Sequence, residues 1–103
     1  MVGGLTLILT TLSKTDEYEV SWEAEGPHFH VHCHVYVWKP SVLKALYGEI
    51  VKVCDLALSM GHSRVYSCTT NKKFCQMLGA ETGMEIFKGY TVMYWKTGDE
   101  YGT

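Results

Sequence analysis

The chain lacks an excess of charge of either sign, has few prolines, and contains no long uninterrupted hydrophobic run. Its 103 residues include 9 lysines and arginines and 11 aspartates and glutamates, which leave a net charge of -2 with neutral histidines. Proteins that bind the nucleic-acid backbone need a basic stripe that displaces counterions from the phosphates. The basic residues here form no such stripe, so we expect no nucleic-acid partner.

Two further absences concern the compartment in which the protein works. Residues 1–9 are apolar, but they carry no positive charge and are interrupted by Thr6, which is typical of a strand and not of a signal peptide or membrane span. The four cysteines include no Cys-x-x-Cys pair. We therefore expect reduced thiols, a cytoplasmic location and no membrane partner.

The residues that are present describe an ordinary globular domain. Hydrophobic residues make up 47% of the chain and charged residues 19%, which is typical neither of a disordered segment nor of a coiled coil. A chain of this length forms one domain, 1–103, and buries roughly 60–65% of its unfolded surface. The sequence shows no internal repeat and no linker.

The first third of the chain is predicted to form three strands. Apolar and polar residues alternate over residues 5–12, 17–25 and 28–38, and Gly26-Pro27 separates the last two runs. A hairpin about Gly26 gives these two strands a fixed relation, because any even-length turn preserves which side chains share a face.

The rest of the chain is predicted to alternate between helix and strand. A long helix over 41–60 is followed by a strand over 62–68, a short helix over 71–78 and a β-prone segment over 84–96, folded as a hairpin about Gly89. The long helix between the third and fourth strands fits a crossover between parallel neighbours, so the order is β-β-β-α-β-α-β in an α/β fold. Its apolar face is predicted to comprise Leu43, Leu46, Tyr47, Ile50, Cys54, Ala57 and Leu58.

The predicted hairpin has one apolar face and one face of alternating glutamates and histidines. The apolar face comprises Tyr18, Val20 and Trp22 with Phe29, Val31, Cys33, Val35 and Val37. The opposite face, which we call the Glu/His face, comprises Glu17, Glu19, Glu23 and Glu25 with His28, His30, His32 and His34, and with Tyr36 and Trp38 beyond them. A four-residue turn after Leu12 adds Leu5, Leu7, Leu9 and Thr11 to the apolar face.

Three interpretations of the Glu/His face stay open. His30 and His32, two residues apart on one strand, place their imidazoles about 6–7 Å apart beside a cross-strand carboxylate, as the start of a metal site would require. Glu–His pairs also stabilise a solvated sheet face without any ligand. The third interpretation is an interface for a protein partner or a second copy, formed by Glu19, Glu23, His28, His30, His32 and His34.

The pairing also predicts how the histidines titrate. An imidazole that faces a carboxylate has a raised pKa, because the negative charge favours its protonated form. The stabilisation would then be present below about pH 6.5 and lost as the pH rises through the raised values.

Three segments in the second part of the chain carry a resemblance to a known family. They are residues 34–40, the helix that ends in Leu58-Ser59-Met60-Gly61, and the run from Asn71 through Phe74 to Leu78-Gly79-Ala80-Glu81. With the strand over 64–69 they cover about two-thirds of the chain and resemble the GNAT superfamily of N-acetyltransferases. The resemblance implies a GNAT-like mixed sheet that lacks the family's first strand and first two helices.

The sequence departs from that family where an active member works. Active members have an Arg/Gln-x-x-Gly-x-Gly/Ala loop at the start of the long helix, whose amides hold the cofactor pyrophosphate. Here residues 38–44 continue into the helix without those glycines. Cys75 stands where many members place the tyrosine that protonates the leaving thiolate. A thiol is able to donate that proton, but we favour a buried structural cysteine.

The resemblance and its departures together predict an interaction protein without acetyltransferase activity and without a cofactor. Truncated GNAT-like chains of this kind are similar to phage-encoded internal virion proteins, so we expect a virion component or a binder of a host factor, located in the virion or the host cytoplasm. The alternative is an N-acetyltransferase with an atypical acetyl-CoA site. Six residues would then hold the cofactor: Tyr36, Val37 and Trp38 along the pantetheine, and Ser41, Val42 and Leu43 at the phosphates. A metal-dependent enzyme built on the histidines is the third hypothesis.

Overall fold

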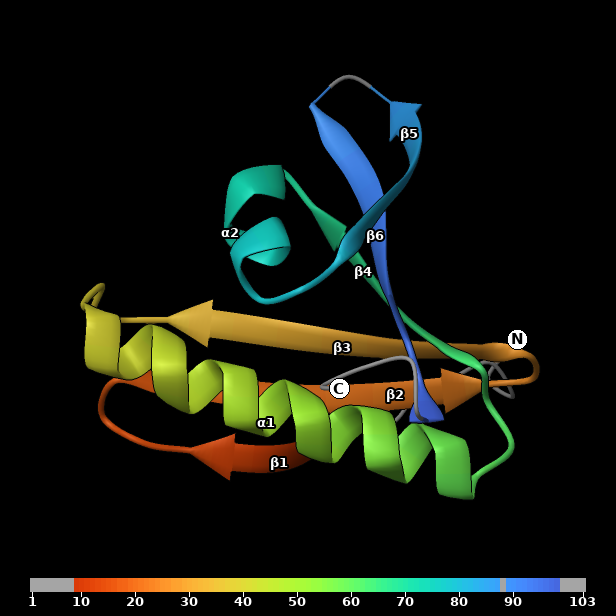
Figure 1. Cartoon of the computed structure of the whole chain (residues 1–103), viewed down its shortest axis with the longest axis horizontal. Coiled ribbons are helices and arrows are strands. Elements are labelled where there is room, and N and C mark those ends of the chain that lie inside the picture. The colour runs from red at the N-terminus through yellow and green to blue at the C-terminus, as the bar shows by residue number, and fades with distance from the viewer. Residues whose placement is uncertain (1–8, 88, 99–103) are drawn as a thin grey trace, which may run out of the picture.

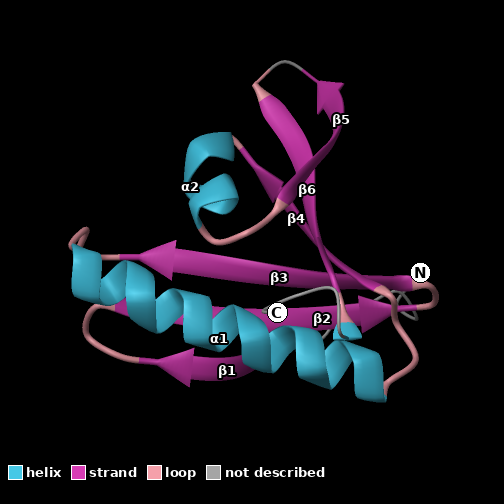
Figure 2. Ribbon diagram, viewed as in Figure 1, coloured by secondary structure: helices cyan, strands magenta, loops and turns pink. Residues whose placement is uncertain are grey.

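Six strands form one mixed sheet in the order β1-β2-β3-β4-β6-β5, with two helices in the connections (Figures 1 and 2). The computed structural model describes residues 9–87 and 89–98. The elements are β1 (Thr10–Lys14), β2 (Tyr18–Glu25), β3 (His28–Val35), α1 (Pro40–Ser59), β4 (Arg64–Thr69), α2 (Lys72–Met77), β5 (Glu81–Phe87) and β6 (Tyr90–Lys96). The α/β class and the order of elements are confirmed. The β-prone segment predicted at the end of the chain forms two strands, β5 and β6, on either side of Gly89. No helix within the described ranges is long and apolar enough to span a bilayer.

The β2–β3 hairpin has the predicted register. Tyr18 pairs with Val35 and Glu25 with His28, and Gly26 takes the positive φ of 57° that the tight turn requires. Tyr18, Val20, Phe29 and Val31 are buried on the apolar face, and Trp22 stacks on Phe29 with ring centroids 5.1 Å apart. The separation of the two faces, which the alternation predicted, is therefore confirmed.

The prediction for the first strand is wrong, because a bulge at Leu12 changes which side chains share a face. Thr11 pairs with Ser21 and so lies on the Glu/His face, whereas Ser13 pairs with Val20 on the other side of the bulge. The turn also comes later than predicted, since the Thr15 hydroxyl accepts hydrogen bonds from the amides of Glu17 and Tyr18. Leu9 is 51% exposed, and Leu5 and Leu7 lie outside the described residues.

Helix α1 lies across β1, β2 and β3 (Figure 1) and buries a face rotated from the predicted one. The buried side chains are Val42, Leu46, Glu49, Ile50, Val53, Cys54 and Ala57. The prediction is wrong for Tyr47 and Leu58, which are 40% and 49% exposed. A pattern of apolar residues alone places Glu49 outside, but here the helix turns its carboxylate inward.

Glu49 is buried with a hydrogen bond to one carboxylate oxygen, Oε2, whereas the other, Oε1, has an ion pair but no hydrogen bond. The Tyr18 hydroxyl donates to Glu49 Oε2 at 2.8 Å, and Lys52 Nζ lies 3.3 Å from Glu49 Oε1. Burial alone would raise the pKa of Glu49, but contacts with Ser13, Tyr18 and Lys52 outweigh it and hold the pKa below its ordinary value. These contacts hold α1 against β1 and β2.

Removal of the Tyr18 hydroxyl should therefore destabilise the fold. We expect Tyr18→Phe to lower the free energy of unfolding by about 1.5–3 kcal/mol, the usual contribution of a hydrogen bond to a charged group. A lowered carboxyl pKa stabilises the fold above the unfolded-state pKa, and this stabilisation is lost as the pH falls through the folded-state pKa. Urea denaturation between pH 7 and pH 3 should thus show a shallower acid-side loss in the variant.

The matched control for this experiment is Tyr36→Phe. The Tyr36 hydroxyl also donates to a carboxylate, Glu19 Oε1 at 3.2 Å, but on an exposed surface. We expect no measurable change in unfolding for this control. Equal losses in the two variants would contradict the role given to Glu49.

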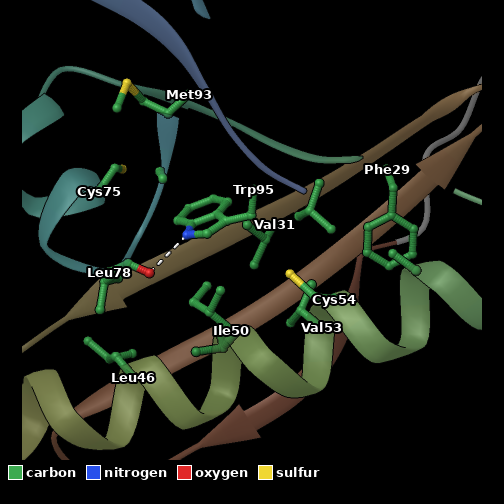
Figure 3. Close-up of a cluster of buried hydrophobic side chains, with 14 of the residues drawn as sticks. Phe29, Val31, Leu46, Ile50, Val53, Cys54, Cys75, Leu78, Met93 and Trp95 are labelled. Atoms are coloured by element: carbon green, nitrogen blue, oxygen red, sulfur yellow. Dashed lines mark hydrogen bonds between the residues drawn. The ribbon is translucent and has the colours of Figure 1, made fainter. Parts of the chain in front are cut away.

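The second helix joins the same core as the first. Asn71 is the N-cap of α2, and its side chain accepts a hydrogen bond from the Phe74 amide at 3.1 Å. Cys75 and Leu78 are buried in the cluster that contains the inner face of α1 and Trp95 (Figure 3). The Trp95 indole Nε1 donates to the Leu78 carbonyl at 3.0 Å. Both helices therefore pack on the apolar face of the sheet.

Candidate functional site

The Glu/His face lies on the side of the sheet away from the helices. The register pairs Glu19 with His34, Ser21 with His32, Glu23 with His30 and Glu25 with His28. The six predicted interface residues, Glu19, Glu23, His28, His30, His32 and His34, therefore share one face. His32 Nε2 lies 3.0 Å from Glu23 Oε1. Within the described part of the chain no helix covers this face. Glu17 departs from the prediction, since it precedes β2 and pairs instead with Lys39 at 2.7 Å.

The face continues onto β4 and β6 through aromatic side chains. The Tyr66 ring lies 6.1 Å from the His30 ring and 6.4 Å from the Tyr94 ring. The Arg64 guanidinium carbon lies 4.4 Å from the centre of the Tyr94 ring, in cation–π contact. The result is a polar and aromatic surface that crosses four strands, with three glutamates on β2 and Arg64 and Lys96 at its far end.

The sequence did not assign Arg64, Tyr66 and Tyr94 to the Glu/His face. Alternation in residues 64–68 puts Arg64 and Tyr66 on one face of β4, but a crossover helix separates β4 from β3. A tight turn preserves which side chains of two strands share a face, but a connecting helix of 20 residues does not. The sequence therefore could not show that Arg64 and Tyr66 lie on the same face as the histidines.

The prediction of raised histidine pKa values is wrong for His30. Its half-buried imidazole loses solvent, which lowers the pKa below its ordinary value. Glu23 raises the pKa, but less than burial lowers it, and the neighbouring His32 and His28 lower it further. Burial between flanking aromatic side chains therefore outweighs the cross-strand carboxylate.

The lowered pKa of His30 gives stability the opposite pH dependence to that predicted. An unfolded histidine titrates near pH 6.5, and folded His30 titrates lower, so the unfolded state takes up the proton first. We expect its contribution to the free energy of unfolding to decrease as the pH falls through 6.5. The His30→Gln variant should lose less stability than the wild type between pH 7 and pH 5. An equal loss in both proteins, measured by urea denaturation, would contradict this assignment.

A metal site on this face lacks a third ligand within the described residues. No group of three or more histidine, cysteine, aspartate or glutamate side chains is close enough to hold an ion in residues 9–87 and 89–98. His30 and His32 share the face, and His32 Nε2 is engaged with Glu23. The metal interpretation stays a prediction without further support.

A cleft opens between β3 and β4. It is lined from both faces of the sheet, since His32, His34 and Cys68 of the Glu/His face line it together with residues of the apolar face. The two parallel strands pair at His30 and Tyr66 and then diverge, as Figure 1 shows. The space between them has a volume of about 310 Å³. Its lining includes Cys33 and Val35 from β3, Ser67 and Thr69 from β4, Cys75 and Phe74 from α2, and the Trp95 ring.

The residues predicted for acetyl-CoA do not fit its phosphates. Pro40 has no amide hydrogen, and the amides of Val42 and Leu43 both donate to the Lys39 carbonyl, at 3.0 and 3.2 Å. Val42 is buried in the core, whereas Ser41 is exposed. The Lys39 ammonium is held by Glu17. The start of α1 therefore offers neither a glycine loop nor a set of free amides to an anion.

The residues predicted for the pantetheine follow the end of β3, which stops before the predicted residue 38, and Trp38 lines the cleft. Strand β3 ends at Val35, so Tyr36, Val37 and Trp38 follow it as an exposed connection, with Trp38 59% exposed. Trp38 packs edge-to-face on Phe74 with ring centroids 4.9 Å apart. This pair joins the end of β3 to α2 across one end of the cleft.

Cys75 lies in the cleft wall as a protonated thiol. It is buried, and burial raises its pKa, with a hydrogen bond from Thr69 lowering it only in part. Burial also raises the pKa of Cys33 to about 12. All four cysteines are free, in agreement with the predicted reduced thiols.

Comparison with known proteins found no match. No family model matches the chain, and no significant match was found among curated proteins or solved structures. The resemblance to the GNAT superfamily therefore remains a prediction from the sequence.

Proposed function

We propose that the chain is a GNAT-like binding protein that does not transfer acetyl groups and acts through its Glu/His face. The observation that carries the proposal is the surface that runs from Glu19 and Glu23 through the histidines to Tyr66 and Tyr94, opposite both helices. Tyrosine and arginine are enriched at protein interfaces, and aromatic rings contribute large contact areas at low entropic cost.

The charges on this face favour a second copy of the chain as the partner. Glutamates lie on β2 at one end, and Arg64 and Lys96 lie at the other, where Lys96 is 3.7 Å from Glu81. A two-fold axis through the histidines sets the acidic end of one copy against the basic end of the other, as an isologous interface requires. The resemblance to phage virion proteins supports an assembly role in a virion, or the binding of a host factor.

Sedimentation over a protein concentration series tests this proposal. We expect a dimer in the wild type and weaker association in Arg64→Glu and in Glu23→Arg, because each places like charges in contact. The double variant should regain part of the affinity. Lys44→Glu, on the opposite side of the sheet, is the matched control. A monomer at all concentrations would assign the face to a different protein, and association unaffected by both reversals would remove the face from the proposal.

The cleft between β3 and β4 favours a second candidate function, acetyl-CoA-dependent N-acetyl transfer with an atypical cofactor site. Its volume and its position between diverging parallel strands support an extended ligand. The bonded amides at the start of α1 and the Trp38–Phe74 pair argue against this candidate. We therefore rank it second.

A further inference from the structure

A second hollow lies between the start of α1 and α2, next to the cleft. It has a volume of about 200 Å³ and is lined by Trp38, Leu43, Asn71, Lys73, Phe74 and Met77. Trp38, Asn71 and Phe74 also line the cleft, so the two hollows meet at the Trp38–Phe74 pair. Together they form one groove, which we call the Trp38 groove.

The walls of the Trp38 groove are apolar and accessible. Trp38 and Met77 are 59% and 56% exposed, and both line the smaller hollow. Tryptophan and methionine are enriched where proteins bind other proteins, tryptophan as an anchor and methionine as an adaptable contact. A contiguous apolar patch of this kind marks a binding surface.

One lysine lines the groove and three more are next to its residues in sequence. Lys73 lines the smaller hollow, Lys39 follows Trp38, Lys44 follows Leu43, and Lys72 lies between Asn71 and Lys73. Lys39 pairs with Glu17, whereas Lys44, Lys72 and Lys73 make no ion pair within the described ranges. The first turn of α1 contains no acidic side chain. The smaller hollow is thus mostly apolar, with Lys73 in its lining and two further lysines without an ion pair next to it in sequence, in a chain of net charge -2.

We infer that the Trp38 groove binds an acidic, apolar peptide segment of a partner protein. Apolar side chains of the segment enter the two hollows on either side of the Trp38–Phe74 pair, and its carboxylates face Lys44, Lys72 and Lys73. The smaller hollow, at about 200 Å³, lies below the range of about 300–1,000 Å³ typical of pockets for whole small molecules and suits a single side chain.

The groove favours a peptide over the other acidic ligands. A nucleic-acid strand needs a basic track with several stacking rings, and here Leu43 and Met77 occupy the floor beside a single exposed tryptophan. The cleft part of the groove shares His32 and His34 with the Glu/His face, whereas the smaller hollow between α1 and α2 is lined by none of the residues of that face except Trp38.

The test uses short fluorescein-labelled peptides rich in glutamate, with a pair of phenylalanines at varied spacing, and measures binding by fluorescence anisotropy. Peptides with lysine in place of glutamate are the matched probes. We expect saturable binding of the acidic peptides, weakened several-fold by physiological salt, because rim charges are screened. We expect a loss of roughly tenfold or more in Trp38→Ala and in the Lys44→Glu, Lys73→Glu double variant.

Two control variants keep the outcome interpretable. Met77→Ser should weaken binding, whereas Met84→Ser, at a methionine 69% exposed on β5, should leave the affinity unchanged. Arg64→Glu should also leave it unchanged, which separates this site from the Glu/His face. Absence of binding by every acidic peptide, equal binding of the lysine peptides, equal binding of a single-stranded oligonucleotide, or full affinity in Trp38→Ala would each overturn the inference.

Discussion

Trp95→Ala should lower the free energy of unfolding by about 3–5 kcal/mol, the usual loss for a buried aromatic side chain. Trp95 is 1% exposed and contacts the core that α1 and α2 share. The variant also removes the hydrogen bond from the indole Nε1 to the Leu78 carbonyl. Because α2 is short, this contact is what positions its end against the sheet. Thermal or urea unfolding measures the loss.

The control is the same substitution at Trp38. This tryptophan is 59% exposed, so Trp38→Ala should cost less than about 1 kcal/mol, in the range of surface changes. The control also shows that the variant used for the Trp38 groove is folded. Similar losses at both positions would contradict the core described for Trp95.

Leu46→Ala should lower the free energy of unfolding by about 2–5 kcal/mol. Leu46 is fully buried where α1 crosses the sheet (Figure 3), and truncation leaves a cavity that close-packed neighbours fill only in part. The expected loss is a large share of the stability of a domain of this size. Urea denaturation with an unchanged m-value would assign the effect to the folded state.

Leu58→Ala is the matched control on the same helix. The helical pattern placed both leucines on the buried face, but Leu58 is 49% exposed. We expect its truncation to cost less than about 1 kcal/mol. If Leu58→Ala were as damaging as Leu46→Ala, the apolar face predicted from the pattern would be right, and the rotation of α1 described above would be wrong.

The elements that depend on local pattern were predictable, and those that depend on one extra residue were not. Alternation and the Gly26 turn define the β2–β3 register, because a tight hairpin carries parity from strand to strand. In β1 a single bulge at Leu12 reverses that parity for Thr11. A bulge has no hydrophobic signature of its own. The rotation of α1 could not be predicted from the helical pattern either, because the burial of Glu49 depends on the Tyr18 hydroxyl, 31 residues away in sequence.

The candidate site was predictable in composition but not in environment. The glutamates and histidines share a face because they alternate on paired strands. The pKa of His30 depends instead on how far neighbours such as Tyr66 exclude water from the imidazole, which requires the packed sheet. The missing glycine loop was visible in the sequence, but the engagement of the Val42 and Leu43 amides by Lys39 was not.

Thermal unfolding with and without millimolar acetyl-CoA, with desulfo-CoA as control, tests the central claim most directly. The account predicts no shift in Tm, because the Val42 and Leu43 amides at the start of α1 donate to the Lys39 carbonyl and the Lys39 ammonium pairs with Glu17. A site filled at a hundredfold excess over its Kd would stabilise the fold by about 2.7 kcal/mol. In a domain of this size that is a rise in Tm of roughly 10 °C or more. A rise of that size would contradict the account and make acetyl transfer the leading function.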